Sequence, residues 1–263
     1  MIFFLHGRDY SNTGDISSCP FQYFDFFKKY DHRFVDIADV MDRHGTSEMS
    51  YSKCVDAVTK DDVVIVGGGG LIGYCDEWHR RINEMTSKAG LAIGWGFGDN
   101  FIGSDKTSVR IDFSKFSILG LRDYVGNSGT YVPCVSCMYP GLKTKFQKKR
   151  KVGVVIHKDL IADSSTFPPG SFIATNAMSQ SSLVRFIGEC EKVMSPSYHV
   201  CYWAALMNVP CTAINGVNYK VVRAKFNHDG GDNSGFIDDC IDRNVKFSLE
   251  VDNLIRGFTN KKR

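Results

Sequence analysis

The stretch KVMSPSYHVCYWAALMNVP, residues 192–210, combines a predicted strand end, a sharp turn and an apolar helix that Pro210 terminates. Ser195 is predicted to be the N-cap and Pro196 the first helical residue, where a missing N–H is no loss. The backbone N–H groups that follow can hold an anion, and His199 lies in this first turn. The alternative interpretation is an ordinary β–α connection with a buried or surface histidine.

Strands and helices alternate on both sides of this stretch. Strands are predicted at residues 1–5, 34–37, 62–66, 91–95, 117–121, 152–156, 171–174, 192–194 and 211–214, and helices at residues 21–30, 76–88, 181–190, 198–208 and 248–258. This alternation indicates parallel sheets with crossover helices, the doubly wound α/β class. The simplest architecture is two Rossmann-like domains with an interdomain cleft.

The composition is that of an ordinary globular protein, with 263 residues, 43% hydrophobic and 23% charged. A net charge of +3 is too small to indicate nucleic-acid binding. No run approaches the roughly 18 apolar residues of an integral membrane segment, and the N-terminus lacks a secretory signal. Nine scattered cysteines, including a lone Cys134-x-x-Cys137 pair, indicate packed thiols in a reducing cytoplasm rather than a metal site. The oligomeric state stays open, a homo-oligomer included.

A basic segment separates the two halves of the chain. KTKFQKKRK, residues 143–151, carries six basic residues in nine. Such a run can bind nucleic acid or act as a nuclear address, but a solvated linker or strand flank is the preferred interpretation. A new strand begins directly after it. We therefore expect an N-terminal Rossmann-like domain at residues 1–145, and a C-terminal one at residues 151–263 that closes with a helix.

A glycine run follows the strand predicted at residues 62–66. Gly68, Gly70 and Gly73 formally satisfy the G-x-G-x-x-G pattern of dinucleotide sites. The next strand, LAIGW, ends without the acidic residue that would bind a ribose, so a dinucleotide cofactor is not expected. The remaining prediction is a flexible loop at the carboxyl edge of a sheet, where open α/β sheets place their ligands.

Other polar residues also follow predicted strands. Asp15 comes after the first strand and is either a general base or a helix cap. Arg122 and Asp123 follow a later strand, and either face the cleft as an ion pair or hold the loop. His157 has the equivalent position at the first strand of the second half. Each of these residues, taken alone, has a structural alternative.

Taken together, these elements occur in an order that resembles the polysaccharide pyruvyl transferase family. The matching segments are Asn12-x-Gly14-Asp15, VIVGGGGLIG at residues 64–73, Gly94-Trp95-Gly96, Arg122-Asp123, and SPSYHVCYWAALMNVP at residues 195–210. The last is similar to the family's Ser-x-Ser-Tyr-His element, which opens a helix. The order and spacing of the segments carry the resemblance, because no single motif is specific.

The resemblance implies a GT-B-like fold and the transfer of a pyruvyl group from phosphoenolpyruvate to two hydroxyls of a sugar. The product is a pyruvate ketal on a glycan or lipid-linked saccharide, and phosphoenolpyruvate serves as co-substrate without a resident cofactor. The enol ether must be protonated at its methylene carbon while the attacking hydroxyls lose protons, which requires an acid and a base. His199 is the candidate acid and Asp15 the candidate base.

Further residues are assigned to the two substrates. The donor-binding candidates are Ser195, Ser197, Tyr198, His157, Arg223 and Lys225, and the acceptor or cleft candidates are Asn12, Gly14, Gly68, Gly69, Gly70, Trp95, Arg122 and Asp123. Two other functions stay open. One is a GT-B glycosyltransferase that uses a nucleotide sugar, with Glu189 and Glu191 as candidate ribose-binding acids. The other is a non-catalytic glycan-binding protein of the same fold.

Overall fold

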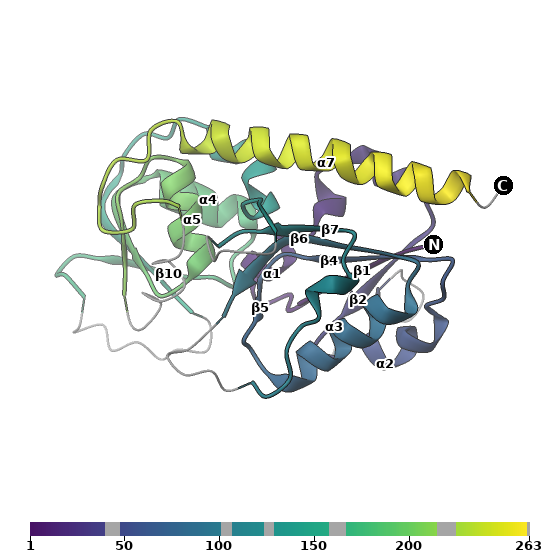
Figure 1. Ribbon diagram of the computed structural model, residues 1–263. Helices are drawn as coiled ribbons and strands as arrows, with labels where there is room; N and C mark the ends of the chain where they lie inside the picture. The colour runs from purple at the N-terminus through teal and green to yellow at the C-terminus, as the bar shows by residue number, and fades with distance from the viewer. Residues whose placement is uncertain (40–47, 101–106, 124–128, 158–166, 215–224, 262–263) are drawn as a thin grey trace. The chain divides into compact units, whose positions relative to one another are not determined.

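The structure is a computed structural model that describes residues 1–39, 48–100, 107–123, 129–157, 167–214 and 225–261 (Figure 1). Contacts within the chain divide it into two compact units. Unit 1 comprises Met1–Asp9, Ser18–Ser136 and Asp242–Arg263, and unit 2 comprises Tyr10–Ser17 and Cys137–Ile241. The short segment Tyr10–Ser17 therefore groups with the second half of the chain, although its neighbours in sequence belong to unit 1.

Unit 1 is built on an eight-stranded sheet in which every pairing is parallel. Its strands are β1 (Ile2–His6), β2 (His32–Asp36), β3 (Glu48–Ser50), β4 (Val63–Gly67), β5 (Gly70–Ile72), β6 (Leu91–Asp99), β7 (Ile118–Leu121) and β8 (Thr130–Tyr131). The order is β3-β2-β1-β4-β6-β7-β8, and β5 pairs with β6. Strands buried on both faces read as continuous apolar runs, which is how the central strands appear in the sequence. The predicted α/β class with parallel sheets is confirmed.

One face of this sheet packs against α3 (Asp76–Lys88), the helix predicted at residues 76–88. Phe3 and Val64 point to this face and share a buried core with Ile82 and Met85 of α3. The shorter α2 (Tyr51–Cys54) and η3 (Val55–Ala57) contribute to the same core, and η4 (Phe113–Lys115) packs against it. Figure 1 shows α2 and α3 together on this side of the sheet.

The opposite face carries an aromatic layer and not the α-helix predicted at residues 21–30. Two 3₁₀ helices lie there, η1 (Pro20–Gln22) and η2 (Asp25–Lys29). Phe21 and Phe27 contact the ring of Phe4, at 5.5 and 5.1 Å between centroids, and Phe24 contacts Trp95 at 5.1 Å. Phe24 has an extended backbone and separates the two 3₁₀ helices, and the rings on either side of it pack on Phe4. One continuous α-helix is therefore absent at residues 21–30, and the helix prediction was wrong.

The last helix, α7 (Phe236–Asn260), begins well before its predicted start at residue 248. Its first residues group with unit 2 and the residues from Asp242 onward with unit 1. Its buried positions in unit 1 include Asn244, Phe247, Val251 and Ile255, which follow helical spacing. Because a polar Asn244 occupies one of these core positions, the apolar pattern of the sequence hides the first turns of the helix.

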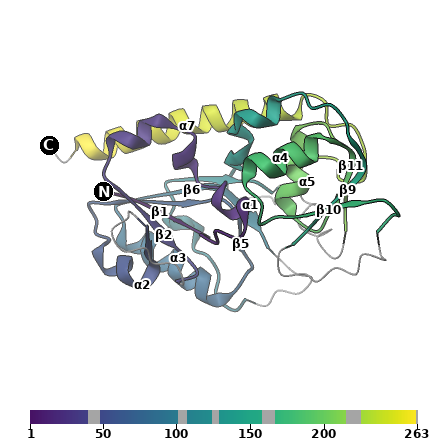
Figure 2. The same cartoon turned by 180° about the vertical axis from the view of Figure 1, so that it is seen from behind.

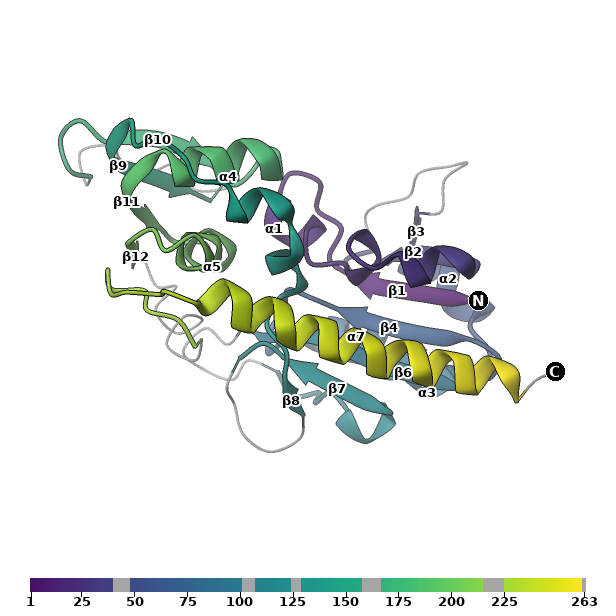
Figure 3. The ribbon, with the colours of Figure 1, turned by 90° about the horizontal axis from the view of Figure 1, so that it is seen from above.

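Unit 2 contains a four-stranded parallel sheet of order β10-β9-β11-β12 (Figure 2). The strands are β9 (Arg150–Ile156), β10 (Phe172–Thr175), β11 (Cys190–Ser195) and β12 (Cys211–Ala213). Helices α4 (Gln180–Gly188) and α5 (Tyr198–Leu206) contact each other and pack against β11 (Figure 3). The remaining short helices are α1 (Thr13–Ile16), η6 (Pro140–Lys143) and η5 (Val135–Met138), which spans the boundary between the units.

Candidate active site

Ser195, the last residue of β11, fixes the turn that leads into α5. Its side chain is fully buried. The hydroxyl donates to the carbonyl oxygen of Val155 in β9 at 2.7 Å and accepts the Ser197 N–H at 3.0 Å. One side chain therefore joins two neighbouring parallel strands and shapes the chain beyond them. Ser195 therefore fixes the position of the turn that carries Ser197 and the start of α5.

Helix α5 begins at Tyr198, the start of the helix predicted at residues 198–208, but with a different cap. The N-cap is Ser197 and the first helical residue is Tyr198, so the predicted cap at Ser195 and first helical position at Pro196 were wrong. The reason is that the Ser195 hydroxyl is engaged with β9 and with the turn. The first N–H groups of an α-helix have no partner within the helix. They lie here at the carboxyl edge of a parallel sheet, the arrangement in which helix starts bind anions.

His199 stands in the first turn of α5 and packs directly against Gly14. Its side chain is 7% exposed, and its ring lies 5.9 Å from that of Trp203. A Cβ atom at Gly14 would overlap the imidazole, at 2.6 Å from Cγ and 2.9 Å from Cβ of His199. Only glycine allows α1 to approach the histidine this closely. Two segments separated by most of the chain thus meet within unit 2.

The segment that carries Gly14 is held on unit 2 by hydrogen bonds. Thr13 donates its N–H to the carbonyl oxygen of Asn176 at 3.1 Å, and its hydroxyl to the carbonyl of Met178. The amide of Asn176 donates to Oδ1 of Asn12 at 3.1 Å. Asn12 in turn donates through Nδ2 to the Asp15 carboxylate at 2.9 Å. Asn12 therefore orients Asp15, the candidate base, which follows Gly14 in the chain.

The other donor-binding candidates differ in their surroundings. The Tyr198 ring is buried and contacts that of Phe226 at 6.0 Å, so it belongs to an aromatic cluster under the helix start. Lys225 precedes Phe226 and is exposed to solvent. His157 follows the last residue of β9 and is half-buried at the same sheet edge. Arg223 lies outside the described residues.

The glycine run of unit 1 is tied into its sheet. Gly68 has a φ of 52° and donates its N–H to the carbonyl of Trp95 at 2.8 Å. The carbonyl of Gly69 accepts the N–H of Gly98 at 2.9 Å, and Gly70 is the first residue of β5. The Trp95 side chain is fully buried and donates its indole N–H to Asn244 at 2.9 Å. These residues shape the carboxyl edge of the unit 1 sheet.

Arg122 and Asp123 are both buried at the end of β7 in unit 1. The Arg122 guanidinium lies 3.7 Å from the Asp123 carboxylate and packs against Gly98, where no Cβ would fit. Asp123 also accepts the N–H of Asp99, and Arg122 donates its own N–H to the carbonyl of Phe97 at 2.8 Å. These bonds connect β7 to the end of β6. Of the two interpretations that the sequence left open for this pair, they agree with the one in which it holds the loop.

The structure also contains a buried polar cluster that the sequence analysis missed. Arg8 Nη1 lies 2.9 Å from His6 Nε2, and the Arg8 N–H donates to Asp36 at 3.2 Å. The Arg8 guanidinium also lies over the ring of Phe34 at 4.8 Å. His6 and Asp36 end two adjacent parallel strands. A polar residue at the end of each predicted strand was the signal available in the sequence.

The described ranges also bear on metal binding, membrane-spanning helices and reactive thiols. There, no three His, Cys, Asp or Glu side chains are grouped as they would be around a metal ion, and none of the helices has the length and apolar character needed to cross a membrane. A hydrogen bond with Cys211 and burial raise the pKa of Cys201 well above its ordinary value, so this thiol beneath the site stays protonated at neutral pH. Cys134 and Cys137 are buried.

Comparisons with known proteins bear on the fold alone. Neither a protein-family model nor a curated protein matches the chain. A crystal structure of an uncharacterized protein from Klebsiella pneumoniae aligns with a TM-score of 0.50 and 14% identity, covering 85% of this chain and 86% of that one. An alpha-glucosyltransferase in complex with UDP and DNA gives TM-scores of 0.45 and 0.49 at 8% and 7% identity, covering 99% of this chain and 93% and 92% of the other. The chain thus shares its α/β fold with a structure whose function is unknown.

Proposed function

We propose that the chain is a transferase that binds a phosphate-bearing donor at the start of α5, with phosphoenolpyruvate as the donor. One observation carries the proposal. The Asn12–Asp15 and Ser195–His199 segments, both part of the resemblance to pyruvyl transferases, lie in contact within unit 2, and Gly14 makes room for the His199 ring. In an ordinary β–α connection, a histidine at the helix start has no need of a glycine from a distant segment packed against its ring.

The reaction has two bond-forming steps. The methylene carbon of phosphoenolpyruvate accepts a proton, which leaves an oxocarbenium-like centre that the first sugar hydroxyl attacks. A second hydroxyl then displaces inorganic phosphate and closes the ketal. Of the two protons lost by the hydroxyls, one is recovered in the new methyl group and the other leaves with phosphate. A proton donor at the methylene carbon and a proton acceptor beside the hydroxyl that attacks the neighbouring carbon are therefore needed.

His199 is the proposed donor of that proton, and Asp15 accepts a proton from the attacking hydroxyl. The hydrogen bond from Asn12 fixes the Asp15 carboxylate, which favours a defined position for the base. The N–H groups of the first turn of α5, from Tyr198 onward, bind the phosphate or carboxylate of the donor. His157 and Lys225 supply further polar or positive groups at the same sheet edge.

The acceptor in this proposal is a glycan or lipid-linked saccharide that offers two hydroxyls. At the carboxyl edge of the unit 1 sheet, Gly68 and Gly69 are buried, and Ser18 and Asn100 lie against Gly68 and Gly70. Because Arg122 and Asp123 are buried in an ion pair, their part is to hold this edge in shape.

A nucleotide sugar is the competing donor. It would use an acidic ribose contact in unit 2, but Glu189 is engaged by Lys149, Arg150 and Arg185. Glu191 is exposed and is the remaining acidic candidate. A ribose contact through Glu191 keeps the nucleotide sugar open as a donor, and titration separates the two donors directly.

The test is a calorimetric titration of phosphoenolpyruvate, UDP, GDP and CMP against the wild type, His199→Ala and the control His32→Gln. His32 is a half-buried histidine of unit 1, remote in sequence from the site. We expect phosphoenolpyruvate alone to bind, with a loss of roughly tenfold or more in His199→Ala and no change in the control. Binding of a nucleotide in place of phosphoenolpyruvate would replace the proposal with glycosyl transfer, and binding of neither would contradict a transferase.

Turnover provides the second readout, measured as phosphate release in the presence of candidate saccharides. Removal of a general acid lowers the rate by about 10²- to 10⁴-fold, so His199→Ala should lose activity to that extent while its circular dichroism spectrum is unchanged. A fully active His199→Ala enzyme would remove the histidine from the mechanism.

A further inference from the structure

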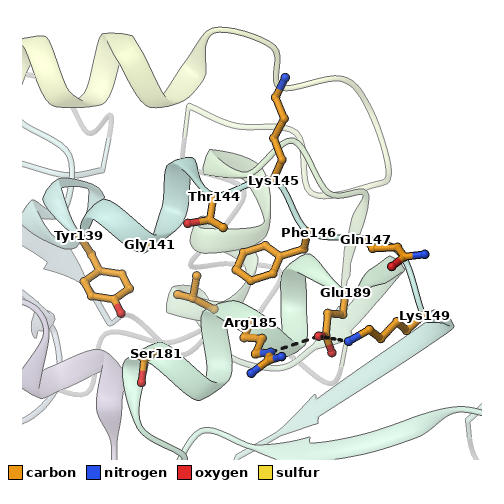
Figure 4. Close-up of a pocket in the computed structure, with 11 residues that line it drawn as sticks. Tyr139, Gly141, Thr144, Lys145, Phe146, Gln147, Lys149, Ser181, Arg185 and Glu189 are labelled. Atoms are coloured by element: carbon orange, nitrogen blue, oxygen red, sulfur yellow. Dashed lines mark hydrogen bonds and ion pairs between the residues drawn. The ribbon is translucent and has the colours of Figure 1, made fainter.

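Unit 2 contains a pocket that shares no residue with the site at His199. It lies between α4 and the chain that runs from η6 into β9, and has a volume of about 450 Å³ (Figure 4). Small-molecule sites in proteins occupy about 300–1,000 Å³. The pocket is therefore of a size that suits a small ligand.

Positive charge is concentrated at one end of this pocket. The Glu189 carboxylate is bound by Lys149 at 2.8 Å, by Arg150 at 2.6 Å and by Arg185 at 3.2 Å. These hydrogen bonds hold the pKa of Glu189 down at about 2, so it is ionised at neutral pH. Three cations share one carboxylate, which leaves an excess of two positive charges. The Lys149 and Arg185 side chains line the pocket and are 52% and 68% exposed.

Glu189 also gives these two cations a fixed direction. Lys149 approaches its carboxylate from the residue that precedes β9, and Arg185 approaches it from helix α4. Figure 4 shows both side chains turned toward Glu189 at the edge of the pocket, whereas Lys145 points away. An anion that enters the pocket meets two preoriented donors. Charge-assisted hydrogen bonds of this kind are about twice as strong as neutral ones.

The rest of the lining consists of aromatic rings and neutral hydrogen-bonding groups. Phe146 is held in place by α4, because a Cβ at Gly188 would lie 2.7 Å from its Cγ atom. The ring of Tyr139 lies on the other side, as Figure 4 shows. Hydroxyl and amide groups come from Ser181, Thr144 and Gln147. Flat apolar faces together with several neutral donors and acceptors suit a ring that carries many hydroxyls.

The same contacts argue against a polyanion such as nucleic acid. Binding along a phosphate backbone requires a continuous stripe of cations. In the basic run at residues 143–151, Lys143 pairs with Asp238 at 2.9 Å. Lys148 turns inward to the carbonyl oxygens of Gly188 and Cys190, at 3.0 and 2.7 Å. The run therefore caps α4 and closes the pocket. Lys149 and Arg185, the two of the three lining cations that turn toward Glu189, fit a single anionic group.

We propose that this pocket binds a sugar that carries one phosphate or one carboxylate, with the charged group on Lys149 and Arg185 and the ring between Tyr139 and Phe146. The inference does not rest on the proposed pyruvyl transfer, because the pocket is complete without His199. Phosphorylated and acidic sugars present the same chemistry to the pocket, so the experiment separates them.

The experiment titrates the full chain by calorimetry with glucose 6-phosphate, glucuronate, glucose, inorganic phosphate and a short oligo-dT strand. We expect one or both of the charged sugars to bind, and glucose and inorganic phosphate to bind at least roughly tenfold more weakly. Arg185→Gln and Lys149→Gln should each weaken the charged sugar by roughly 10- to 100-fold. These side chains are exposed, and Arg150 still neutralises Glu189 in each variant, so the fold is retained.

Two controls make the result specific to the pocket. Lys151→Gln removes an exposed lysine of the same basic run that does not line the pocket, and should leave affinity unchanged. His199→Ala should also bind the charged sugar normally, which separates this site from the proposed donor site. Phe146→Leu keeps an apolar side chain against Gly188 and should weaken the sugars without affecting inorganic phosphate.

Several outcomes would overturn the proposal. Glucose binding as tightly as glucose 6-phosphate would remove the role of the cations, and inorganic phosphate binding equally well would leave only an anion site. Preference for the oligo-dT strand would reassign the basic run to nucleic acid. Absence of binding by both charged sugars at millimolar concentration, or full affinity in Arg185→Gln and Lys149→Gln, would likewise contradict it.

Discussion

Gly14 of unit 2 and Gly68 of unit 1 both come from segments that the sequence singles out, yet they make room for different things. Gly68 follows β4 in the left-handed region and lies against the main chain of Ser18, whose carbonyl oxygen a Cβ would overlap. Gly14 lies against the imidazole of His199. One glycine lets two stretches of backbone pass each other, and the other brings an ionisable ring to a helix start.

The difference teaches how to separate structural glycines from those that serve a site. At Gly68 the neighbour is Ser18, through both its carbonyl oxygen and its small side chain, and the Gly68 N–H donates to the carbonyl oxygen of Trp95 in the next strand. At Gly14 the neighbour is a side chain that a transferase can use, and the glycine backbone itself has no unusual φ. We therefore expect substitution at Gly68 to damage folding, and substitution at Gly14 to damage ligand binding more than folding.

The largest effect is predicted for Gly68→Ala. Strain at the positive φ and overlap with the carbonyl oxygen and side chain of Ser18 each cost about 1–3 kcal/mol, so the variant should lose roughly 2–6 kcal/mol of unfolding free energy. Urea denaturation followed by circular dichroism measures this loss. Gly170→Ala is the matched control, since Gly170 has a φ of 77° with nothing within 4 Å, and should show the conformational cost alone. Equal losses in the two variants would show that the Ser18 contact costs nothing.

Gly14→Ala should have a smaller effect on stability, roughly 1–3 kcal/mol of overpacking, and a larger effect on donor binding. The added methyl must displace either α1 or the ring of His199, which changes the position of the proposed acid. Phosphoenolpyruvate titration and urea denaturation of the same variant measure the two effects. Donor affinity at the wild-type level would break the comparison, because Gly14 would then be a packing residue like Gly68.

The double variant Gly14→Ala/His199→Ala sharpens this test. Without the imidazole, the new methyl no longer meets the ring atoms, and the remaining overlap is with Cβ of residue 199 at 2.9 Å. The loss of stability in the double variant should therefore be smaller than the sum of the two single losses. Additive losses would show that the two residues do not act on each other.

The fold was largely predictable from the sequence because its central strands are continuous apolar runs. The strands at β4, β6, β9 and β11 and the helix α3 all carry clear local patterns. The strands β3, β5 and β8 are only two or three residues long, which is too short for any period to show. They exist because a neighbouring strand presents unpaired main-chain groups, which no local pattern records.

The candidate site was predictable in its residue types and not in its assembly. Ser195–His199 has a local signature, since serine and proline before an apolar run favour a helix start. That Tyr10–Ser17 would join unit 2 has no such signature, because it depends on main-chain bonds to Asn176 and Met178. The cap of α5 is Ser197 and not the predicted Ser195 for the same kind of reason, because the Ser195 hydroxyl donates to β9. Hydrogen bonds to main-chain carbonyl oxygens far along the chain decided both features.

The smallest effect is predicted for Gly257→Ala, and its sign is opposite to the others. Gly257 lies in the last turns of α7, is exposed, has no unusual φ, and would place its Cβ with nothing within 4 Å. Alanine loses less conformational freedom than glycine in a helix, so the variant should gain about 0.5–1 kcal/mol of unfolding free energy. Urea denaturation beside Gly68→Ala measures the gain. A loss of stability would mean that a glycine with no atoms near its Cβ position is still required for folding. The type of neighbouring atom would then no longer explain the difference between Gly14 and Gly68.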